Sequence, residues 1–554
     1  MFEEIKNIDP EKMDVSEMKH ASRLMLNIIE GQASMIDNQA KEIKFLKDEI
    51  DKLKGGQGGY TPRYPNVTSD LDKAKGKGKG KGSRKKGKKG GGKKANLKVD
   101  QTIRCQMDKS KLPADAKLHR YDRLIQQDLI IKRHNTLFEI PVYYSKTTNK
   151  TYRGELPADY QGQFGGKLKA WIQLLHHYCD TTQGRLKALF KNLDIVISTG
   201  TINNILLSHT DKMDKETLDI LSAGIKQAGY AQVDHTKTFE AGQSKGTQVI
   251  CGPLFSGYRT MEGKLQAHVI AALQGRVGND VPLLYDEQAV ADLKASLVPK
   301  KDQRLINGLL ELGQTYSLES YEAILKNANA SHLIKKVISH NKVLAILALR
   351  YYKTQTDFPI LKNMVTDAGP EYKGITDHRA MCWFHEERLY KKMIPKITIH
   401  QKAVDKVIGQ IWIFYKKLAE FKECSLTEQK KRRKGLIKDF DKIFTQRTVY
   451  DELNKKIENT FSRKEKLLRV LYFPDIPLHN NLAELAIRRK VRKRDISLHT
   501  MSAQGTRAQD AFMSVVETAA KLGVNALDYL YDRITGQYKM PSLADLIRLR
   551  PTTF

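Results

Sequence analysis

The sequence predicts a multidomain α/β protein, and three observations carry that prediction. The chain has 554 residues, which is too long for one hydrophobic core and fits three or four structural units. Apolar residues make up 40% of the chain, enough to bury several cores. Heptad-spaced isoleucines, a lysine–glycine stretch and strand-like segments that end in aspartate follow one another along the sequence. They predict a coiled coil, a linker and a mixed-sheet core in that order.

Residues 1–54 are expected to form a coiled-coil dimerisation segment. Isoleucine recurs every seven residues, and leucines occupy the matching d positions of the last two heptads. The repeating isoleucines are Ile29, Ile36, Ile43 and Ile50. Isoleucine at a and leucine at d favour a parallel two-stranded coil, so this segment predicts a homodimer or a higher oligomer. The alternative is an amphipathic helix that packs on its own chain.

Residues 55–98 are expected to form a disordered linker. From Lys73 to Lys94 the sequence has 12 basic residues, 8 glycines and no acid in 22 positions. Such a composition cannot bury a core. Lysines near phosphates release counterions, so the stretch predicts DNA affinity without sequence preference.

Two smaller units are expected before the core. Residues 99–160 predict a β-rich unit, because Leu129–Ile131 and Leu137–Tyr144 are β-prone runs between polar turns. Residues 161–222 predict a helical unit in which Ser198 caps a short helix.

That helical unit has the pattern with which a helix–turn–helix DNA-binding motif begins. A helix and a turn precede the capped helix, which buries Ile202, Ile205 and Leu206 and presents Asn203 and Asn204 outward. An ordinary helical hairpin has the same pattern.

Three acids within the core, residues 223–538, predict a metal site. Asp234 ends an alternating apolar strand, Asp367 follows a short apolar stretch, and Glu484 lies on a helix. Phosphodiester cleavage and strand transfer use two divalent ions held by carboxylates, and Mg²⁺ takes only a few protein oxygens. Two aspartates and one glutamate therefore predict a site for two Mg²⁺ ions, with Mn²⁺ as a substitute.

Each acid also has a structural interpretation. Asp234 and Asp367 could terminate strands, because aspartate favours turns. Glu484 could complete a capping box if Asn481 were the helix N-cap.

The formal net charge of +32 predicts a polyanionic partner, and nucleic acid is the commonest one in a cell. Six of the seven residues that begin one turn after Glu484 are basic, which predicts that they lie beside the DNA phosphates. They are Arg488, Arg489, Lys490, Arg492, Lys493 and Arg494.

Four segments resemble, in order, the conserved blocks of the insertion-sequence 66 type transposases of bacteria: "VDHT", "MVTDAGPEY", "MCWFHEER" and "LHNNLAELAIRR". The later "MSVVETAAKLGVNALDYL" resembles the closing helices of that family, so the resemblance covers about residues 160–535. It implies a ribonuclease-H-like core with a catalytic triad on Asp234, Asp367 and Glu484.

The resemblance also implies a function. Such a transposase binds double-stranded DNA at the ends of a mobile element, cleaves it and joins 3′-hydroxyl ends to target DNA, sometimes with accessory transposition proteins. The alternatives are a non-enzymatic DNA-binding protein derived from a transposase, and a ribonuclease-H-like DNA nuclease.

The "CWFH" segment matches a C-x2-H signature found in several transposase groups between the second aspartate and the glutamate. Cys382 and His385 could bind zinc, but no second pair is visible, so we expect a structural or DNA-positioning role near the active site, with Cys382 as a buried core residue as the equal alternative. The other expected supporting residues are Arg388, Asn480 and Asn481.

The sequence departs from the family pattern at three places, one of them the last block, where His479 and Leu485 stand in place of the usual Asp and Arg. His235 stands where the family has a glutamate, and Cys105 is alone where many members carry a zinc unit, so the β-rich unit is expected to lack metal. Helical insertions are expected near 286–355 and 391–470, and a C-terminal tail at 539–554.

Five widely spaced cysteines predict neither a disulfide framework nor a zinc ribbon. No signal peptide and no apolar run of membrane-spanning length is present. We therefore expect a cytoplasmic, nucleoid-associated bacterial protein without a membrane partner.

Overall fold

The computed structural model describes residues 14–53, 99–105, 121, 123–129, 131–157, 160 and 162–550. These divide into two compact units, one formed by Met1–Met35 with Asn135–Phe554 and the other by Ile36–His134. The linker expected at 55–98 lies outside the described residues. No helix in the described ranges is both long and apolar enough to cross a membrane.

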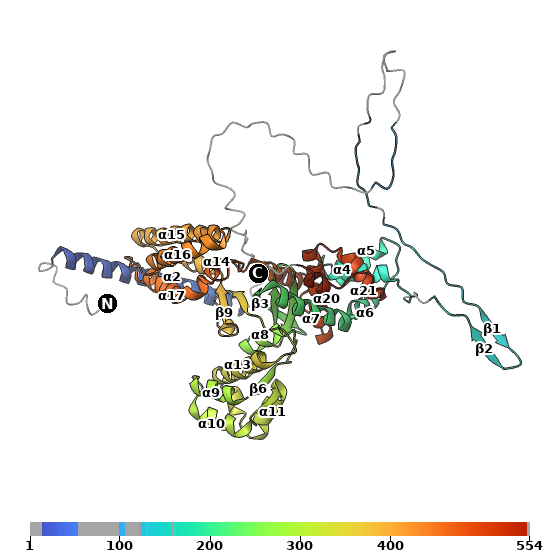
Figure 1. Cartoon of the computed structure of the whole chain (residues 1–554), viewed down its shortest axis with the longest axis horizontal. Coiled ribbons are helices and arrows are strands. Elements are labelled where there is room, and N and C mark those ends of the chain that lie inside the picture. Colours follow the sequence, from blue (N-terminus) through green and yellow to red (C-terminus); the bar gives the residue numbers. More distant parts are fainter. Residues whose placement is uncertain are drawn as a thin grey trace, which may run out of the picture. The chain divides into compact units, whose positions relative to one another are not determined.

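A mixed five-stranded sheet lies at the centre of the first unit, which confirms the α/β class. Its strand order is β5-β4-β3-β8-β9, with β3, β4 and β5 antiparallel and with β8 and β9 parallel to β3 (Figure 1). The strands are β3 (Tyr230–Glu240), β4 (Gln243–Cys251), β5 (Ser256–Met261), β8 (Asn363–Thr366) and β9 (His378–Met381).

Strand β3 is longer than the sequence predicts. The expected strand ended at Asp234, but β3 continues to Glu240 and turns into β4 through Ala241 and Gly242. Both turn residues have positive φ, of 46° and 81°, which suits a two-residue hairpin that keeps the strands paired. Asp234 therefore lies in the middle of a strand that is hydrogen-bonded on one side by β4.

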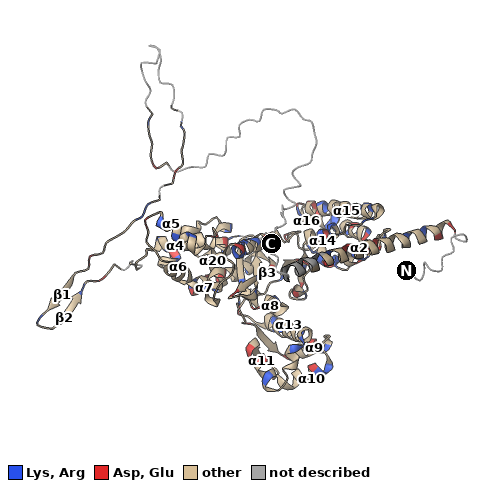
Figure 2. Ribbon diagram, turned by 180° about the vertical axis from the view of Figure 1, so that it is seen from behind, with Lys and Arg blue, Asp and Glu red and all other residues tan. Residues whose placement is uncertain are grey.

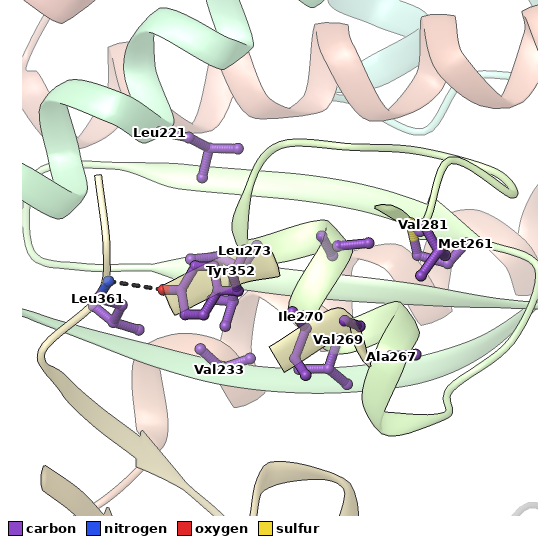
Figure 3. Packing of buried hydrophobic residues seen from close by; sticks show 14 of the residues in the cluster. Leu221, Val233, Met261, Ala267, Val269, Ile270, Leu273, Val281, Tyr352 and Leu361 are labelled. Carbon is purple, nitrogen blue, oxygen red and sulfur yellow. Dashed lines mark hydrogen bonds between the residues drawn. The ribbon is translucent and has the colours of Figure 1, made fainter. Parts of the chain in front are cut away.

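The hydrophobic core lies on one face of this sheet. Val233 packs there with Leu221 of α7 (Thr210–Ala228) and Ile270 of α8 (Gln266–Leu273) (Figure 3). The hydroxyl of Tyr352 accepts a hydrogen bond from the Leu361 backbone N–H at 2.8 Å, which satisfies both groups inside this core (Figure 3). Because side chains alternate along a strand, the neighbours of Val233 face the opposite side of the sheet.

The two predicted insertions interrupt the sheet connections. The first lies between β5 and β8 and is helical, but it also contains a two-stranded sheet that was not expected. It consists of β6 (Pro282–Tyr285), α9 (Glu287–Ala295), α10 (Lys300–Leu309), β7 (Gln314–Ser317), α11 (Leu318–Asn327), α12 (His332–Lys335) and α13 (Val337–Thr354).

The second insertion lies between β9 and the helix that carries Glu484. Its helices enclose a separate aromatic core around Trp383, Phe414 and Phe440. Figure 2 marks the Lys and Arg positions on these helices. They are α14 (Trp383–Lys391), α15 (Thr398–Lys422), α16 (Leu426–Phe444), α17 (Asp451–Phe461), α18 (Lys464–Leu467) and the 3-10 helix η3 (Arg469–Leu471).

Helix α2 (Val15–Leu53) packs its first half on this second insertion (Figure 1). The carboxylate of Glu30 accepts hydrogen bonds from the backbone N–H groups of Lys396 and Ile397, at 2.6 and 2.9 Å, and lies 3.2 Å from Nδ1 of His400. The side chain of Asn27 bonds the backbone at the start of α17. Docking on its own chain, which the sequence left as an alternative, therefore occurs in this half of the helix.

The smaller units differ in how far they follow the sequence pattern. Within the described part of 99–160 the strands are β1 (Val142–Ser145) and β2 (Lys150–Arg153), one exposed hairpin without a buried core. The helical unit contains α4 (Gly166–His177), α5 (Gln183–Lys191) and α6 (Thr199–Leu207).

Two further helices follow α20 (Ala503–Leu522): α21 (Ala526–Thr535) and α22 (Leu543–Arg548). Helix α22 lies in the expected tail, yet Leu543, Ala544 and Ile547 are buried in the main core. Only the last four residues of the expected tail lie outside the described part of the chain.

Candidate active site

Asp234, Asp367 and Cys382 occupy equivalent positions on or just after three adjacent parallel strands. Gln232 of β3 pairs with Val365 of β8, and Val365 pairs with Ala380 of β9. Two residues further along each strand come Asp234, Asp367 and Cys382. Since side chains two residues apart point to the same face, this register places all three on one side of the sheet.

The Asp367 carboxylate is held by the turn that follows β8. Its Oδ1 accepts the backbone N–H of Gly369 at 3.0 Å. The buried guanidinium of Arg379 donates to the carbonyl oxygens of Asp367 and Gly369, at 2.7 and 2.9 Å, and to the Thr366 hydroxyl at 2.9 Å. Arg379 is a buried arginine in the short strand β9, directly before Ala380 and Met381, and a charged residue next to these apolar ones is the sequence signal that could have identified it.

Glu484 is brought to the sheet by the N-terminus of α19 (Asn481–Ser497). The side-chain oxygen of Gln232 accepts the backbone N–H of Leu482 at 2.9 Å, and the Asn480 amide donates to the Val233 carbonyl at 3.2 Å. Strand β3 therefore caps the helix that follows it by about 250 residues, and Gln232 is a positioning residue that sequence reasoning missed.

The capping-box interpretation of Glu484 is wrong. The helix N-cap is Asn480 rather than Asn481, and its side chain makes no capping hydrogen bond. Glu484 is thus one residue too far along the helix to close a capping box. Its carboxylate instead lies 3.6 Å from Nδ1 of His385 and 3.9 Å from Nη2 of Arg388, so both of these expected supporting residues do lie beside it.

Asp234 lies among other carboxylates. Burial raises its pKa, the backbone N–H of His235 lowers it, and the charges of Asp367, Glu484 and Glu371 raise it again, to about 7. Asp367 and Glu484 are therefore among the charges that act on Asp234, although the three carboxylates do not form a group with ligand atoms within 4.8 Å of one another among the described residues. Such neighbouring charges disfavour the ionisation of Asp234 unless a cation is present.

Three residues beside Asp234 were not predicted as site residues. His235 Nδ1 lies 2.8 Å from the Tyr372 hydroxyl and 3.3 Å from Oε1 of Glu371. Tyr372 belongs to the 3-10 helix η2 (Pro370–Tyr372) that follows Gly369. His235, which replaces the family glutamate, thus faces a glutamate supplied by the Asp367 turn.

The basic run on α19 divides into exposed and buried residues. Arg488 and Arg492 are exposed and follow Glu484 at intervals of four, on one face of the helix. Lys490 is buried and pairs with Asp510 of α20 at 2.6 Å, and Lys493 is buried and donates to the carbonyl of His176 in α4.

Two further arginines of the run also contact the protein. Arg489 pairs with Glu517 and lies over the Tyr178 ring, and Arg494 donates to the Lys237 carbonyl at 2.6 Å. The expectation of six DNA-facing residues therefore fails for Lys490 and Lys493, because burial leaves them no surface for a phosphate.

The helical unit has the local structure that the sequence predicts. Ser198 Oγ accepts the Thr201 backbone N–H, and Ile202, Ile205 and Leu206 are buried. Asn204 is exposed, as expected for a DNA-facing residue. Asn203 is half-buried, and its side-chain oxygen accepts a hydrogen bond from Gln183 of α5 at 3.1 Å.

Cys382, His385 and Glu484 form one cluster of possible metal ligands. Their Sγ, imidazole nitrogen and carboxylate oxygen all lie within 4.8 Å of one another. Cys382 is buried, as its core alternative requires, but its Sγ accepts the Asn480 backbone N–H at 3.3 Å and so faces the site.

A separate hollow of about 450 Å³ lies beside α7 and α13. It is lined by Asp214, Asp219, Asp280 and Asp357, with Arg276 paired to Asp280 at 2.8 Å. Its acidic lining does not suit a polyanion, so it is not part of the candidate site.

Comparisons with known proteins agree with the residue pattern. The model of the transposase IS66 family matches residues 361–508, which include Asp367, Cys382, His385 and Glu484. The chain is 31% identical over 329 residues to an uncharacterized protein, y4jO, of Sinorhizobium fredii (strain NBRC 101917 / NGR234). That alignment covers 57% of this chain and 94% of that protein. No solved structure matches the chain.

The family model matches the blocks around Asp367 and Glu484, and the relative aligns over nearly its whole length. The chain therefore belongs to the IS66 family of transposases.

Proposed function

We propose that this protein cleaves DNA at the ends of a mobile element and joins the resulting 3′-hydroxyl ends to target DNA, using two Mg²⁺ ions held by Asp234, Asp367 and Glu484. The observation that carries the proposal is the convergence of these acids. Asp234 lies on β3, Asp367 directly follows the adjacent strand β8 in the equivalent register, and Glu484 lies in the first turn of a helix whose N-terminus β3 caps.

The donor set fits a pair of hard divalent ions. Carboxylate oxygens are the ligands that Mg²⁺ prefers, and all three side chains are half-buried, so solvent and substrate can reach them. The raised pKa of Asp234 reflects burial and carboxylate crowding, which a divalent cation would relieve. Bound there, two such ions would activate the attacking oxygen and stabilise charge on the leaving oxygen.

The surrounding residues bind and orient the DNA strand. Arg488 and Arg492 follow Glu484 along one face of α19 over about 12 Å, at 1.5 Å per residue, and each can hold a backbone phosphate. Arg379 keeps the Asp367 carboxylate in place through the backbone of its turn. Gln232 does the same for Glu484 through the N-terminus of α19.

The second insertion supplies a further basic surface. Residues Lys430, Lys431, Arg432 and Lys434 are exposed on α16. These positive charges suit double-stranded DNA and give affinity independent of sequence, with Arg432 also paired to Glu428 at 2.7 Å. We propose that the central sheet is the ribonuclease-H-like core that the family resemblance implies, and its mixed order with two parallel strands beside β3 supports that assignment.

The experiment uses the full chain and DNA that carries the inverted repeats flanking its gene. Asp234→Asn, Asp367→Asn and Glu484→Gln should each abolish Mg²⁺-dependent cleavage, by at least about a thousandfold, because each removes a metal ligand. Glu311→Gln, an exposed glutamate in the first insertion, is the matched control and should cleave normally.

Three results would contradict the proposal. Cleavage that persists in the three variants contradicts the site assignment. Repeat binding without cleavage under Mg²⁺ or Mn²⁺ favours a non-enzymatic DNA-binding protein, and cleavage of branched DNA regardless of end sequence favours a nuclease.

A further inference from the structure

Glu484 belongs to two different sets of possible metal ligands. One set is the proposed group of carboxylates, whose oxygens suit Mg²⁺. The other set adds Cys382 and His385, whose sulfur and nitrogen atoms Mg²⁺ does not use. A thiolate, an imidazole and a carboxylate are the ligands that Zn²⁺ takes.

Burial raises the pKa of the Cys382 thiol, so the free residue keeps its proton, but the position of its sulfur suits a metal-bound thiolate. This residue is the N-cap of α14, where the helix dipole favours negative charge, and its Sγ receives the backbone N–H of Asn480 at 3.3 Å. Hydrogen bonds from backbone amides to sulfur are the outer contacts that tune metal-bound cysteines. His385 lies three residues further, on the first turn of the same helix.

The imidazole is also unsatisfied. Nδ1 of His385 is a buried atom with no hydrogen-bond partner among the described residues, and its nearest acidic neighbour is Oε1 of Glu484 at 3.6 Å. Ligand atoms around tetrahedral zinc lie about 3.3 to 3.8 Å apart, given bonds of about 2.0 to 2.3 Å. The ligand atoms of Cys382, His385 and Glu484 lie within 4.8 Å of one another, so they would have to move about 1 Å closer together to bind zinc.

We propose that Cys382, His385 and Glu484 form a Zn²⁺ site, and that zinc bound there withdraws Glu484 from the Mg²⁺ site and so inhibits the enzyme. The inhibition by zinc rests on the proposed function, whereas the zinc site itself does not. Binding releases the thiol proton of Cys382 to solvent, and water completes the coordination. Glu484 then has two alternative positions, one for DNA cleavage and one for the inhibited protein.

Cobalt(II) is the probe for the site itself, because a thiolate bound to Co²⁺ gives a charge-transfer absorption in the near ultraviolet. The full chain should bind one equivalent with this absorption, and Zn²⁺ should displace it. Cys382→Ser should abolish the absorption, whereas Cys424→Ser, a cysteine outside the cluster, should leave it unchanged. His385→Ala and Glu484→Gln should weaken Co²⁺ binding by more than about tenfold.

A wild-type chain without the thiolate absorption, or an absorption that persists in Cys382→Ser, would overturn the zinc site. If Cys382→Ser does not fold, as judged by circular dichroism, His385→Ala decides instead, because its side chain is 30% exposed. Unchanged Co²⁺ affinity in that variant counts against the site.

Competition for Glu484 is measured by Mn²⁺ binding, followed by electron paramagnetic resonance. Loading with one equivalent of Zn²⁺ should lower the number of bound Mn²⁺ ions in the wild type but not in Cys382→Ser. Equal Mn²⁺ binding with and without zinc would refute the withdrawal of Glu484. A wild type that binds no Mn²⁺ at all would refute the proposed Mg²⁺ site and the inhibition that rests on it, while the cobalt result still decides the zinc site.

Discussion

At the scale of single residues, the site combines acids that are visible in the sequence with partners that are not. Asp234, Asp367 and Glu484 each follow a local pattern, a strand or a helix start, and the family blocks identify them. Gln232 has no such pattern, Glu371 lies in a family block without being singled out, and Arg379 shows only as a charged residue in a short strand. Their roles depend on hydrogen bonds and charges that join residues 12 to 250 positions apart, or across the Asp367 turn.

The carboxyl of Asp234 should make metal-free stability depend on pH. Its pKa is about 7 in the folded protein, against an ordinary value of 3.8. Between these values the folded state holds a proton that the unfolded state releases, so the unfolding free energy contributed by this group falls as pH rises. Asp234→Asn should flatten that part of the pH dependence in chemical unfolding without metal, whereas Asp357→Asn, an exposed control, should not.

Bound Mg²⁺ should stabilise the folded protein more as the pH rises, which is opposite to the effect of the proton on Asp234. Because the bound ion needs the ionised carboxylate, Mg²⁺ should raise the melting temperature more at about pH 8 than at about pH 5. An equal rise in Asp234→Asn would show that the ion binds elsewhere.

At the scale of elements, α19 has two functions along one helix. Its Glu484–Arg488–Arg492 face is open, whereas Lys490 and Lys493 connect the helix to α20 and α4. The position of Glu484 is therefore tied to the helical unit that contains α5 and α6. A sequence window of seven residues cannot separate these roles, because helix rotation alone decides which lysine is buried.

Substitutions on α19 should separate DNA binding from stability. Arg488→Ala and Arg492→Ala should each reduce the slope of log affinity against log salt by about 1, with unfolding unchanged, because each removes one phosphate contact. Lys490→Met should instead cost about 3 to 5 kcal/mol, because it leaves the Asp510 carboxylate buried and unpaired. Fluorescence anisotropy at several salt concentrations and urea unfolding measure the two effects. A stability loss in Arg492→Ala equal to that in Lys490→Met would contradict the division of α19 into an exposed DNA-binding face and a buried structural face.

The first half of α2 should stabilise the second insertion through Glu30. This carboxylate is buried and accepts two backbone N–H groups just before α15, while His400 lies between it and the ring of Tyr450. Glu30→Ala should lower the unfolding free energy by about 3 kcal/mol, because it leaves buried donors without an acceptor. Glu42→Ala, an exposed position on the same helix, is the control in urea unfolding. Identical midpoints for the two variants would count against the docked helix.

At the scale of the whole molecule, α2 has a second, open face. Ile29, Ile36, Ile43 and Leu46 are each more than half exposed, although the same helix buries Glu30. The coiled coil therefore stays a prediction, and the exposed stripe is the surface on which it is tested.

The isoleucine stripe should control self-association. Replacing Ile29, Ile36 and Ile43 together by Asn should raise the dimer dissociation constant at least about a hundredfold, because each isoleucine contributes about 1.5 to 3 kcal/mol when buried. Met35→Asn, exposed but outside the heptad positions, should leave it unchanged. Sedimentation velocity measures the association, and a triple variant that still forms dimers would exclude the zipper.

The sequence by itself determined the α/β class, the helical insertions and the capped helix at Ser198, because these depend on local periodicity and turn residues, whereas the three acids stay a prediction from the family blocks. Only the tertiary structure decided that β3 continues past Asp234, that Asn480 is the cap of α19, that two lysines of the basic run are buried and that α2 docks through Glu30. The physical reason is that burial and hydrogen-bond partners are set by contacts between distant segments, such as Gln232 with Leu482. No local pattern contains that information.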